Sequence, residues 1–204
     1  MFKDFIFAHH SANTQQLAVA IVRGAFEYQG QKCSAASRAY IPKEIWNETL
    51  DYIKGMIPQI KMGSSMGLSN FMNSVIDEKS FDTIVSYVER AKQSDKAEIV
   101  IGGNSDKSIG YFIEPTIIVT TDPQYETMTT ELFGPVITIY LYDADKYEET
   151  LALCDSTSPY ALTGSIFAHS RYDIDTAMQA LRYSAGNFYI NDKPTGAVVG
   201  NQPF

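Results

Sequence analysis

Two hydrophobic periodicities alternate along the chain, and this alternation most restricts the folds open to it. Apolar residues that recur every three to four positions predict helices, and short apolar runs predict strands. Strands are expected at 5–7, 37–42, 98–103, 111–119, 136–142, 162–168 and 187–191, and helices around 17–28, 46–57, 81–88, 147–154 and 174–181. Strands covered by intervening helices predict an α/β fold, and the absence of any repeat or linker predicts one domain.

Composition narrows the classes of protein and of partner. The 204 residues are 45% hydrophobic and 20% charged, which is typical of an ordinary globular protein. The net charge of −8 argues against a nucleic-acid surface, and no apolar run reaches the roughly 18 residues that a membrane span needs. Cys33 and Cys154 lie too far apart to indicate a disulfide framework and suit a reducing compartment. Small molecules are therefore the expected partners.

A glycine-containing stretch, "IGGNSDKSIG" at residues 101–110, raises the question of nucleotide binding. A dinucleotide fingerprint lies between a strand and a helix, whereas this stretch follows a strand and opens no helix. We expect a hairpin or surface loop here.

The cysteine in "FEYQGQKCSA", residues 26–35, is the first candidate for chemistry. A free cysteine usually packs in a core, yet Cys33 follows a polar loop. Lys32 adds positive charge, and a helical turn begun by "SAAS" would direct backbone N–H groups at the sulfur, where they would favour a thiolate or hold an oxyanion. The alternative is a loop cysteine that is merely exposed. Cys154, on a helical stripe with Tyr147 and Leu151, is expected in the core.

Two further segments have both a functional and a purely structural interpretation. In "TTELFGP", the structural alternative is a helix that ends at Gly134, with Glu131 in solvent and Phe133 in the core. In "NDKPTGAVVGNQPF", the irregular pattern predicts a loop with free backbone N–H groups, or a plain connection. No carboxylate or cysteine lies at metal-ligand spacing from His9, His10 or His169, so no metal-binding residues are predicted. These histidines are expected at the surface or as helix caps.

Taken together, "FEYQGQKCSA", "ELFGP" and "GNFYIND" in this order resemble the catalytic half of the aldehyde dehydrogenase superfamily over essentially the whole chain. Longer stretches, among them "GYFIEPTI" and "DSTSPYALTGSIF", are similar to the branch of 1-pyrroline-5-carboxylate dehydrogenases, which oxidise glutamate semialdehyde to glutamate in proline breakdown. The resemblance implies a catalytic α/β domain over residues 1–204, with a mostly parallel central sheet flanked by helices.

The resemblance also implies roles for individual residues. Cys33 is implied to be the catalytic nucleophile. The reaction is implied to pass through a thioester on this cysteine, with NAD as the hydride acceptor. The implied cofactor-binding residues are Glu131, on the nicotinamide ribose, and Phe133, beside the nicotinamide ring. The implied substrate-binding residues are Ser34, Gly196, Ala197 and Phe204. Some relatives have serine where this chain has Ala197, so a backbone N–H is expected to replace that hydroxyl contact.

By the same resemblance, the nucleotide-binding domain and the C-terminal segment that pairs subunits are expected to lie outside residues 1–204, so the chain alone is expected to lack turnover. The full-length protein is expected to be a homo-oligomer, cytoplasmic in a bacterium and in the mitochondrial matrix of a eukaryote. Two alternatives stay open: an aldehyde dehydrogenase with another substrate, or a non-catalytic association domain in which Cys33 is a relic.

Overall fold

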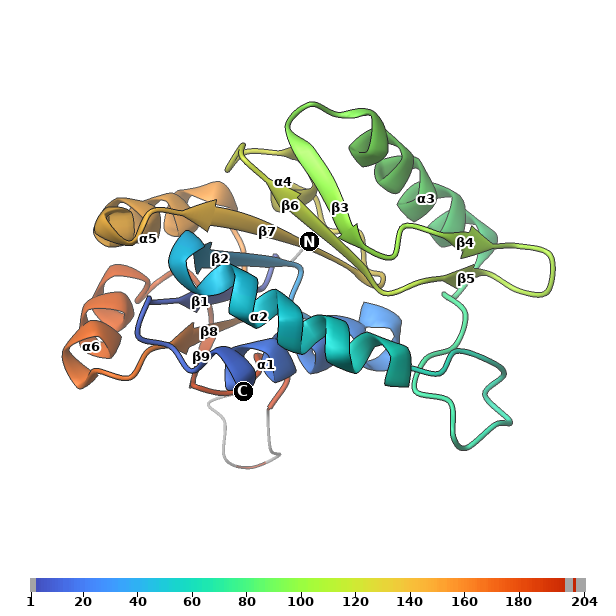
Figure 1. Cartoon of the computed structure of the whole chain (residues 1–204), viewed down its shortest axis with the longest axis horizontal. Coiled ribbons are helices and arrows are strands. Elements are labelled where there is room, and N and C mark those ends of the chain that lie inside the picture. The colour runs from blue at the N-terminus through green and yellow to red at the C-terminus, as the bar shows by residue number, and fades with distance from the viewer. Residues whose placement is uncertain (1–2, 197–199, 201–204) are drawn as a thin grey trace.

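The computed structural model describes residues 3–196 and 200, which form an α/β domain (Figure 1). The helices are α1 (Thr14–Phe26), α2 (Lys43–Met56), α3 (Glu78–Gln93), α4 (Glu126–Thr129), α5 (Tyr147–Thr157) and α6 (Arg171–Ala180). The strands are β1 (Phe5–Ala8), β2 (Arg38–Pro42), β3 (Ala97–Ile101), β4 (Ser105–Asp106), β5 (Phe112–Ile113), β6 (Thr116–Thr120), β7 (Val136–Tyr142), β8 (Thr163–Phe167) and β9 (Asn187–Ile190). No helix in the described part of the chain is long and apolar enough to cross a membrane.

Seven strands form the main sheet in the order β3-β6-β7-β2-β1-β8-β9. All neighbouring pairs are parallel except β3 with β6, which is antiparallel. The mostly parallel sheet that the resemblance implied is therefore confirmed. The strand expected at 98–103 is β3, which lies at the edge of the sheet and has side chains that are only half-buried or exposed.

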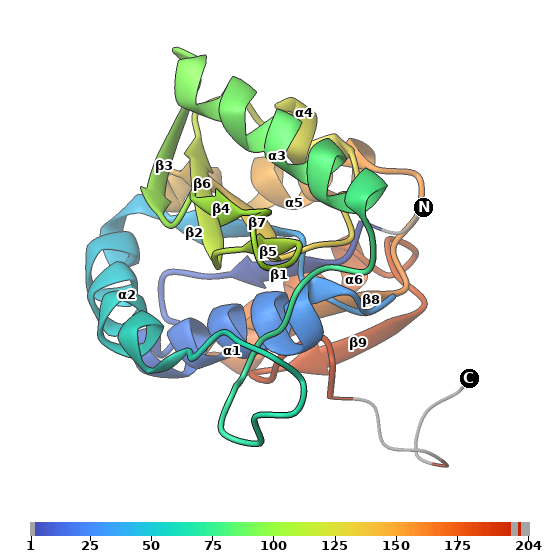
Figure 2. The ribbon, with the colours of Figure 1, turned by 90° about the vertical axis from the view of Figure 1, so that its right-hand side faces the viewer.

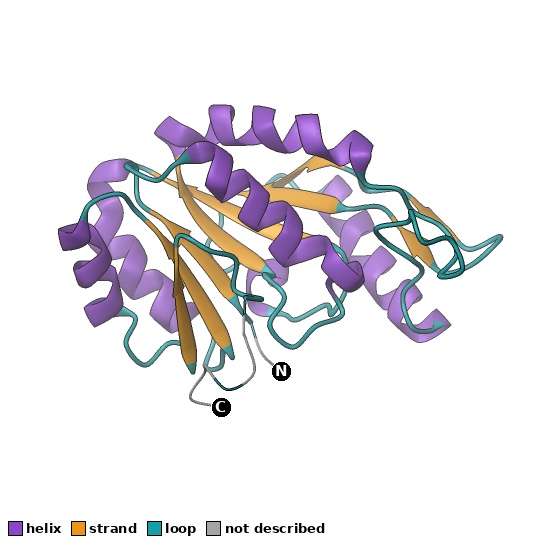
Figure 3. Ribbon diagram, turned by 90° about the horizontal axis from the view of Figure 1, so that it is seen from below, coloured by secondary structure: helices purple, strands orange, loops and turns teal. Residues whose placement is uncertain are grey.

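Helices cover both faces of the sheet, as Figure 3 shows with strands between two sets of helices. On one face, α1 and α2 pack against β1 and β2 through residues such as Ile6, Leu17 and Ile53. On the other face, Phe7 of β1 packs with α5 and α6. Helix α3 covers the same face at its other end, above β6 in Figure 2, with Ile84 in the core. The alternating inward residues of each parallel strand therefore supply two separate cores.

The sequence placed the helix ends less well than the helices themselves. Asn13 accepts a hydrogen bond from the Gln16 N–H and caps α1. The end of this helix was expected at residue 28, but α1 ends at Phe26 and the Tyr28 side chain turns into solvent. The glycine-containing stretch at 101–110 is confirmed as a hairpin, since β4 pairs with β5.

Four segments lead into the adjacent parallel strands β7, β2, β1 and β8, and therefore meet at one edge of the sheet, here called the amino edge. They end at Pro135, Ser37, Asp4 and Leu162, directly before each strand. Parallel α/β sheets usually bind ligands at the opposite, carboxyl edge. Cys33 and Glu131 both lie in segments that enter the sheet at the amino edge.

Candidate active site

Cys33 is an exposed free thiol in the loop that enters β2. A single turn spans Lys32 to Ala35, closed by a 3.1 Å hydrogen bond from the Ala35 N–H to the Lys32 carbonyl. No helix begins at residues 34–37, so the expected helical turn of "SAAS" is wrong. Within the described residues, the N–H groups of Cys33 and Ser34 donate no hydrogen bond, and both remain available beside the sulfur.

The loop reaches Cys33 through a run of left-handed backbone. Tyr28, Gln29 and Gly30 have φ angles of 56°, 58° and 67°. Two non-glycine residues in this region carry strain, which the surrounding structure must offset. Gln29 contributes to that support, because its buried side-chain amide donates to the Ser74 carbonyl at 3.3 Å.

A second loop, residues 131–135, lies against this run. A Cβ atom on Gly30 would overlap the carbonyl oxygen of Gly134 and lie 2.8 Å from that of Ala25. The structural alternative for "TTELFGP" is wrong, because α4 ends at Thr129, Glu131 is half-buried, and the Phe133 side chain is 47% exposed at a φ of 53°. The loop of Glu131 and Phe133 is thus fixed beside the loop of Cys33.

The segment that begins "NDKPTG", at residues 191–196, follows β9 and turns back along α1. The Gly196 N–H donates to the Lys193 carbonyl at 3.3 Å and closes a turn, so the expectation that this N–H is free is wrong. Gly196 has no positive φ, but space beside it is limited, since a Cβ there would lie 3.3 Å from the Tyr189 ring and 2.9 Å from Asp192 Oδ2, an exposed carboxylate that can rotate away. The predicted residues Ala197 and Phe204 lie outside the described residues.

A carboxylate joins the first and third segments. Glu27 Oε2 accepts hydrogen bonds from Lys32 Nζ at 3.0 Å and from Lys193 Nζ at 2.9 Å, while Oε1 pairs with Arg23. Burial alone would raise the pKa of Glu27, but these three donors outweigh it and lower the pKa to about 2. The Lys32 ammonium, whose charge was expected to act on Cys33, is therefore ion-paired with Glu27.

Two buried charged residues lie behind Ser34 at the amino edge. Asp4 accepts hydrogen bonds from the backbone of Leu162 at 2.7 Å and from the Thr163 hydroxyl at 3.0 Å, and that hydroxyl also approaches the Ser34 carbonyl at 3.5 Å. Burial raises the pKa of Asp4 to about 6 despite these bonds. Burial and the Arg38 charge lower the pKa of Lys3 to about 7, while the negative charges of Glu131 and Asp4 oppose that shift. Glu131 thus lies within electrostatic range of both residues.

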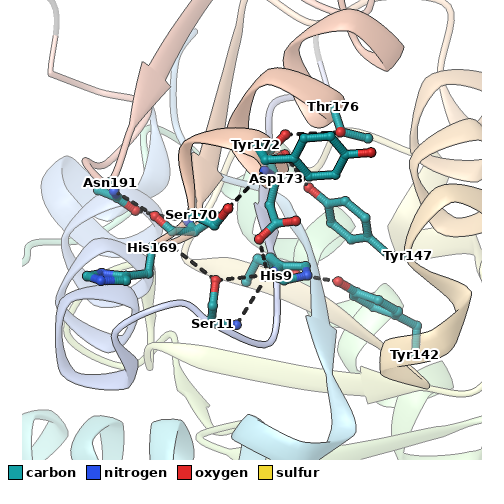
Figure 4. A network of polar contacts seen from close by, with 12 residues as sticks. His9, Ser11, Tyr142, Tyr147, His169, Ser170, Tyr172, Asp173, Thr176 and Asn191 are labelled. Atoms are coloured by element: carbon teal, nitrogen blue, oxygen red, sulfur yellow. Dashed lines mark hydrogen bonds and ion pairs between the residues drawn. The ribbon is translucent and has the colours of Figure 1, made fainter.

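The carboxyl edge carries a separate polar network, shown in Figure 4. His9 Nδ1 lies 2.8 Å from Ser11 Oγ and 3.4 Å from Asp173 Oδ2, and its ring packs against Tyr147. His10 and His169 are exposed as expected, but a surface position for His9 is wrong, because this ring is buried by α5 and α6. The described residues contain no group of three His, Cys, Asp or Glu side chains that could hold a metal.

Cys154 is confirmed as a core residue. Its side chain is fully buried on the inner face of α5, and burial raises the pKa of its thiol to about 12. Only one of the two thiols is therefore placed for reaction with a solute.

The fold and the site define a class: a three-layer α/β domain that presents one exposed thiol at the amino edge of its sheet. The chain belongs to the aldehyde dehydrogenase family, which matches residues 3–204. It is 56% identical over 202 residues to the mitochondrial delta-1-pyrroline-5-carboxylate dehydrogenase of Dictyostelium discoideum and 45% identical over 203 residues to the human enzyme of that name. Each alignment covers 99% of this chain, which spans about a third (36%) of each relative.

Solved structures agree with these relatives. The delta-pyrroline-5-carboxylate dehydrogenase of Mycobacterium tuberculosis matches with a TM-score of 0.91 and 44% identity, over 100% of this chain and 37% of that one. The same enzyme has been solved with NAD bound. The 1-pyrroline-5-carboxylate dehydrogenase from Thermus with bound NAD matches with a TM-score of 0.86 and 30% identity, over 99% of this chain and 38% of that one. The α/β fold and the resemblance to this branch are confirmed.

Sequence reasoning missed the ion pairs of Glu27 and the burial of Lys3 and Asp4. The pair Arg23 and Glu27 has the i,i+4 spacing of a helical ion pair, which was a visible signal. The contact from Lys193 to Glu27 spans 166 positions and had no local signal. The burial of Lys3 and Asp4 was likewise hidden, because a charged pair before a strand is usually solvated.

Proposed function

We propose that Cys33 is the nucleophile of an NAD-dependent oxidation of glutamate semialdehyde to glutamate. One observation carries this proposal: the exposed thiol of Cys33 lies in a loop that is packed against the loop of Glu131 and Phe133 and ion-paired to the loop of Gly196. The names of the relatives supply the reaction and the substrate, and the arrangement of these loops supports both.

The first step is addition of the Cys33 thiolate to the aldehyde carbon, which gives a hemithioacetal whose oxygen carries the negative charge. The N–H groups of Cys33 and Ser34, beside the sulfur, are suited to hold this oxyanion. Loss of hydride from the same carbon leaves a thioester on Cys33. Attack of water on the thioester then releases the carboxylate product and returns the thiol.

NAD, when bound, supplies the acceptor for that hydride. Two observations on this chain fit the cofactor: the Glu131 carboxylate is a half-buried hydrogen-bond acceptor suited to ribose hydroxyls, and the Phe133 ring is held partly in solvent by a left-handed backbone. We assign Glu131 to the ribose and Phe133 to the nicotinamide face. For the substrate we assign Ser34, the Gly196 turn, Ala197 and Phe204.

Alkylation of the two cysteines tests the nucleophile. Brief exposure to iodoacetamide, followed by peptide mapping, is expected to modify Cys33 well before Cys154, because reactivity follows thiolate fraction and access. In the holoenzyme, Cys33→Ser is expected to abolish NADH production from glutamate semialdehyde. Full activity of that variant would overturn the proposed role, and preference for aldehydes without a carboxylate would point to another substrate class.

Assembly and compartment are part of the same proposal. The full-length protein forms a homo-oligomer in this proposal. It is placed in the mitochondrial matrix of a eukaryote or in the cytoplasm of a bacterium. Relatives from Dictyostelium and human are named as mitochondrial. Light scattering of the holoenzyme tests the first assignment, and fractionation of the source cells tests the second.

A further inference from the structure

We propose that Glu27 is a positioning residue that ties the turn of Gly196 to the loop of Cys33, and so fixes the distance between the substrate's carboxylate and the nucleophile. This inference rests on the proposed function, because the turn is assigned there to the substrate. Glu27 itself is assigned no contact with substrate or cofactor.

The geometry of the tie is specific. A single oxygen, Glu27 Oε2, accepts from Lys32 at 3.0 Å and from Lys193 at 2.9 Å. Lys32 directly precedes Cys33 in the chain, and Lys193 begins the turn that Gly196 closes. Lys193 Nζ also donates to the Thr195 hydroxyl at 2.9 Å, so the same ammonium fixes the turn internally and anchors it to Glu27.

Burial makes this tie stronger than an ordinary surface ion pair. The Glu27 side chain is only 13% exposed and that of Lys193 is 24% exposed, whereas Arg23 is 54% exposed and adds less. Packing supports the charges, since a Cβ on Gly24 would lie 3.3 Å from the Pro194 ring and 3.7 Å from Lys193 Cβ. The end of α1 and the turn therefore meet over both polar and apolar contacts.

The charge balance suits an anionic substrate. Three cations share the one carboxylate of Glu27, and the Asp192 carboxylate lies beside Gly196, so a net charge of +1 (three cations less two carboxylates) remains around the turn after the ion pairs form. Surplus charge of one sign attracts ligands of the other sign and speeds their association. Glu27 thus holds the cations in place without cancelling their attraction for a carboxylate.

The tie is tested on the chain itself, without turnover, by hydrogen exchange of the backbone amides of Lys193, Thr195 and Gly196. Glu27→Gln keeps the shape and removes the charge, and it is expected to speed exchange there about tenfold. Lys193→Met is expected to do the same and Lys193→Arg much less, because arginine still reaches the carboxylate. In the double variant Glu27→Gln with Lys193→Met, the effects are expected to be no larger than in either single variant. Unchanged exchange in Glu27→Gln, or additive effects, would overturn the tie.

Steady-state kinetics of the holoenzyme separate this inference from the proposed function. Glu27→Gln is expected to raise KM for glutamate semialdehyde about five- to tenfold, while kcat/KM for an uncharged aldehyde of similar length changes less than about twofold. Equal losses for both aldehydes, with faster exchange, would mean that Glu27 has a structural role only. Wild-type enzyme that does not distinguish the two aldehydes would instead contradict the proposed substrate and leave the tie intact.

Discussion

The backbone of Gly30 lies directly against the carbonyl group of Gly134, so the loop that carries Cys33 and the loop that carries Glu131 are in contact without intervening side chains. Gly30 also has a φ of 67°, where a Cβ atom is disfavoured. Both features require glycine at this position. The two loops that we assign to nucleophile and cofactor are therefore positioned by a contact that a single methyl group would break.

Gly30→Ala tests this contact. The added methyl is expected to lower the free energy of unfolding by about 1–3 kcal/mol, the usual cost of left-handed strain and overpacking, and to change the alkylation rate of Cys33. The matched control is Gly55→Ala in α2, where a Cβ meets nothing within 4 Å and the helix gains about 0.5–1 kcal/mol. Urea unfolding measures both. Equal stability of the Gly30 variant and wild type would contradict the packing.

The acid stability of the chain is expected to depend on Glu27. The pKa of Glu27 is lowered from an ordinary value of 4.5 to about 2, so folding stabilises the ionised carboxylate relative to the protonated acid. The stability that this provides is fully present above pH 4.5 and is lost as the pH falls toward 2. In urea unfolding, the stability difference between wild type and Glu27→Gln should shrink from pH 6 to pH 3. A difference independent of pH would show that the ion pairs contribute nothing.

Lys3 is expected to change the stability of the fold at neutral to alkaline pH. Its pKa is lowered from 10.5 to about 7, so between these values the unfolded chain binds more protons than the folded chain, and stability rises with pH. Lys3→Met should flatten that rise. Unfolding at pH 7 and 8.5 is the informative comparison, because the buried thiol of Cys154, with its raised pKa, makes stability fall with pH above about 9. A wild-type stability that falls from pH 7 to 8.5 would count against the buried ammonium.

The sequence predicted the layers of this fold but not the contacts between its loops. Helical stripes and apolar strands depend on neighbours within a few positions, which is why the helix of Leu17 and the strand of Phe5 were found. Cys33 stood out because a cysteine in a polar loop conflicts with plain packing, whereas the role of Glu131 was implied only by the resemblance. The tie between Glu27 and Lys193, and the contact of Gly30 with Gly134, depend on chain segments more than 100 positions apart, for which one sequence carries no signal.

Local conformation was predicted less well than residue type. The sequence predicted free backbone N–H groups in the loop of Gly196, whereas the Gly196 N–H donates to the Lys193 carbonyl. The sequence also predicted a helical turn that begins after Cys33. The structure instead has one hydrogen-bonded turn at residues 32–35, followed by chain that leads into β2 without a helix. The backbone of short loops is set by what they pack against, and those partners come from distant segments.

The final prediction concerns Gly196 and substrate selection in the holoenzyme. Gly196→Val adds two methyl groups beyond a Cβ that already lies 3.3 Å from the Tyr189 ring and 3.4 Å from the Lys193 carbonyl oxygen, so the turn is expected to shift. Hydrogen bonds to a charged group contribute roughly 1.5–3 kcal/mol, so displacing the turn should lower kcat/KM for glutamate semialdehyde by about one to two powers of ten. An uncharged aldehyde of similar length, which makes no such bonds, should lose much less. This second aldehyde is the internal control, because general misfolding would harm both substrates alike. Equal losses would mean that the turn does not bind the carboxylate, and the proposal would reduce to an aldehyde dehydrogenase of another substrate class.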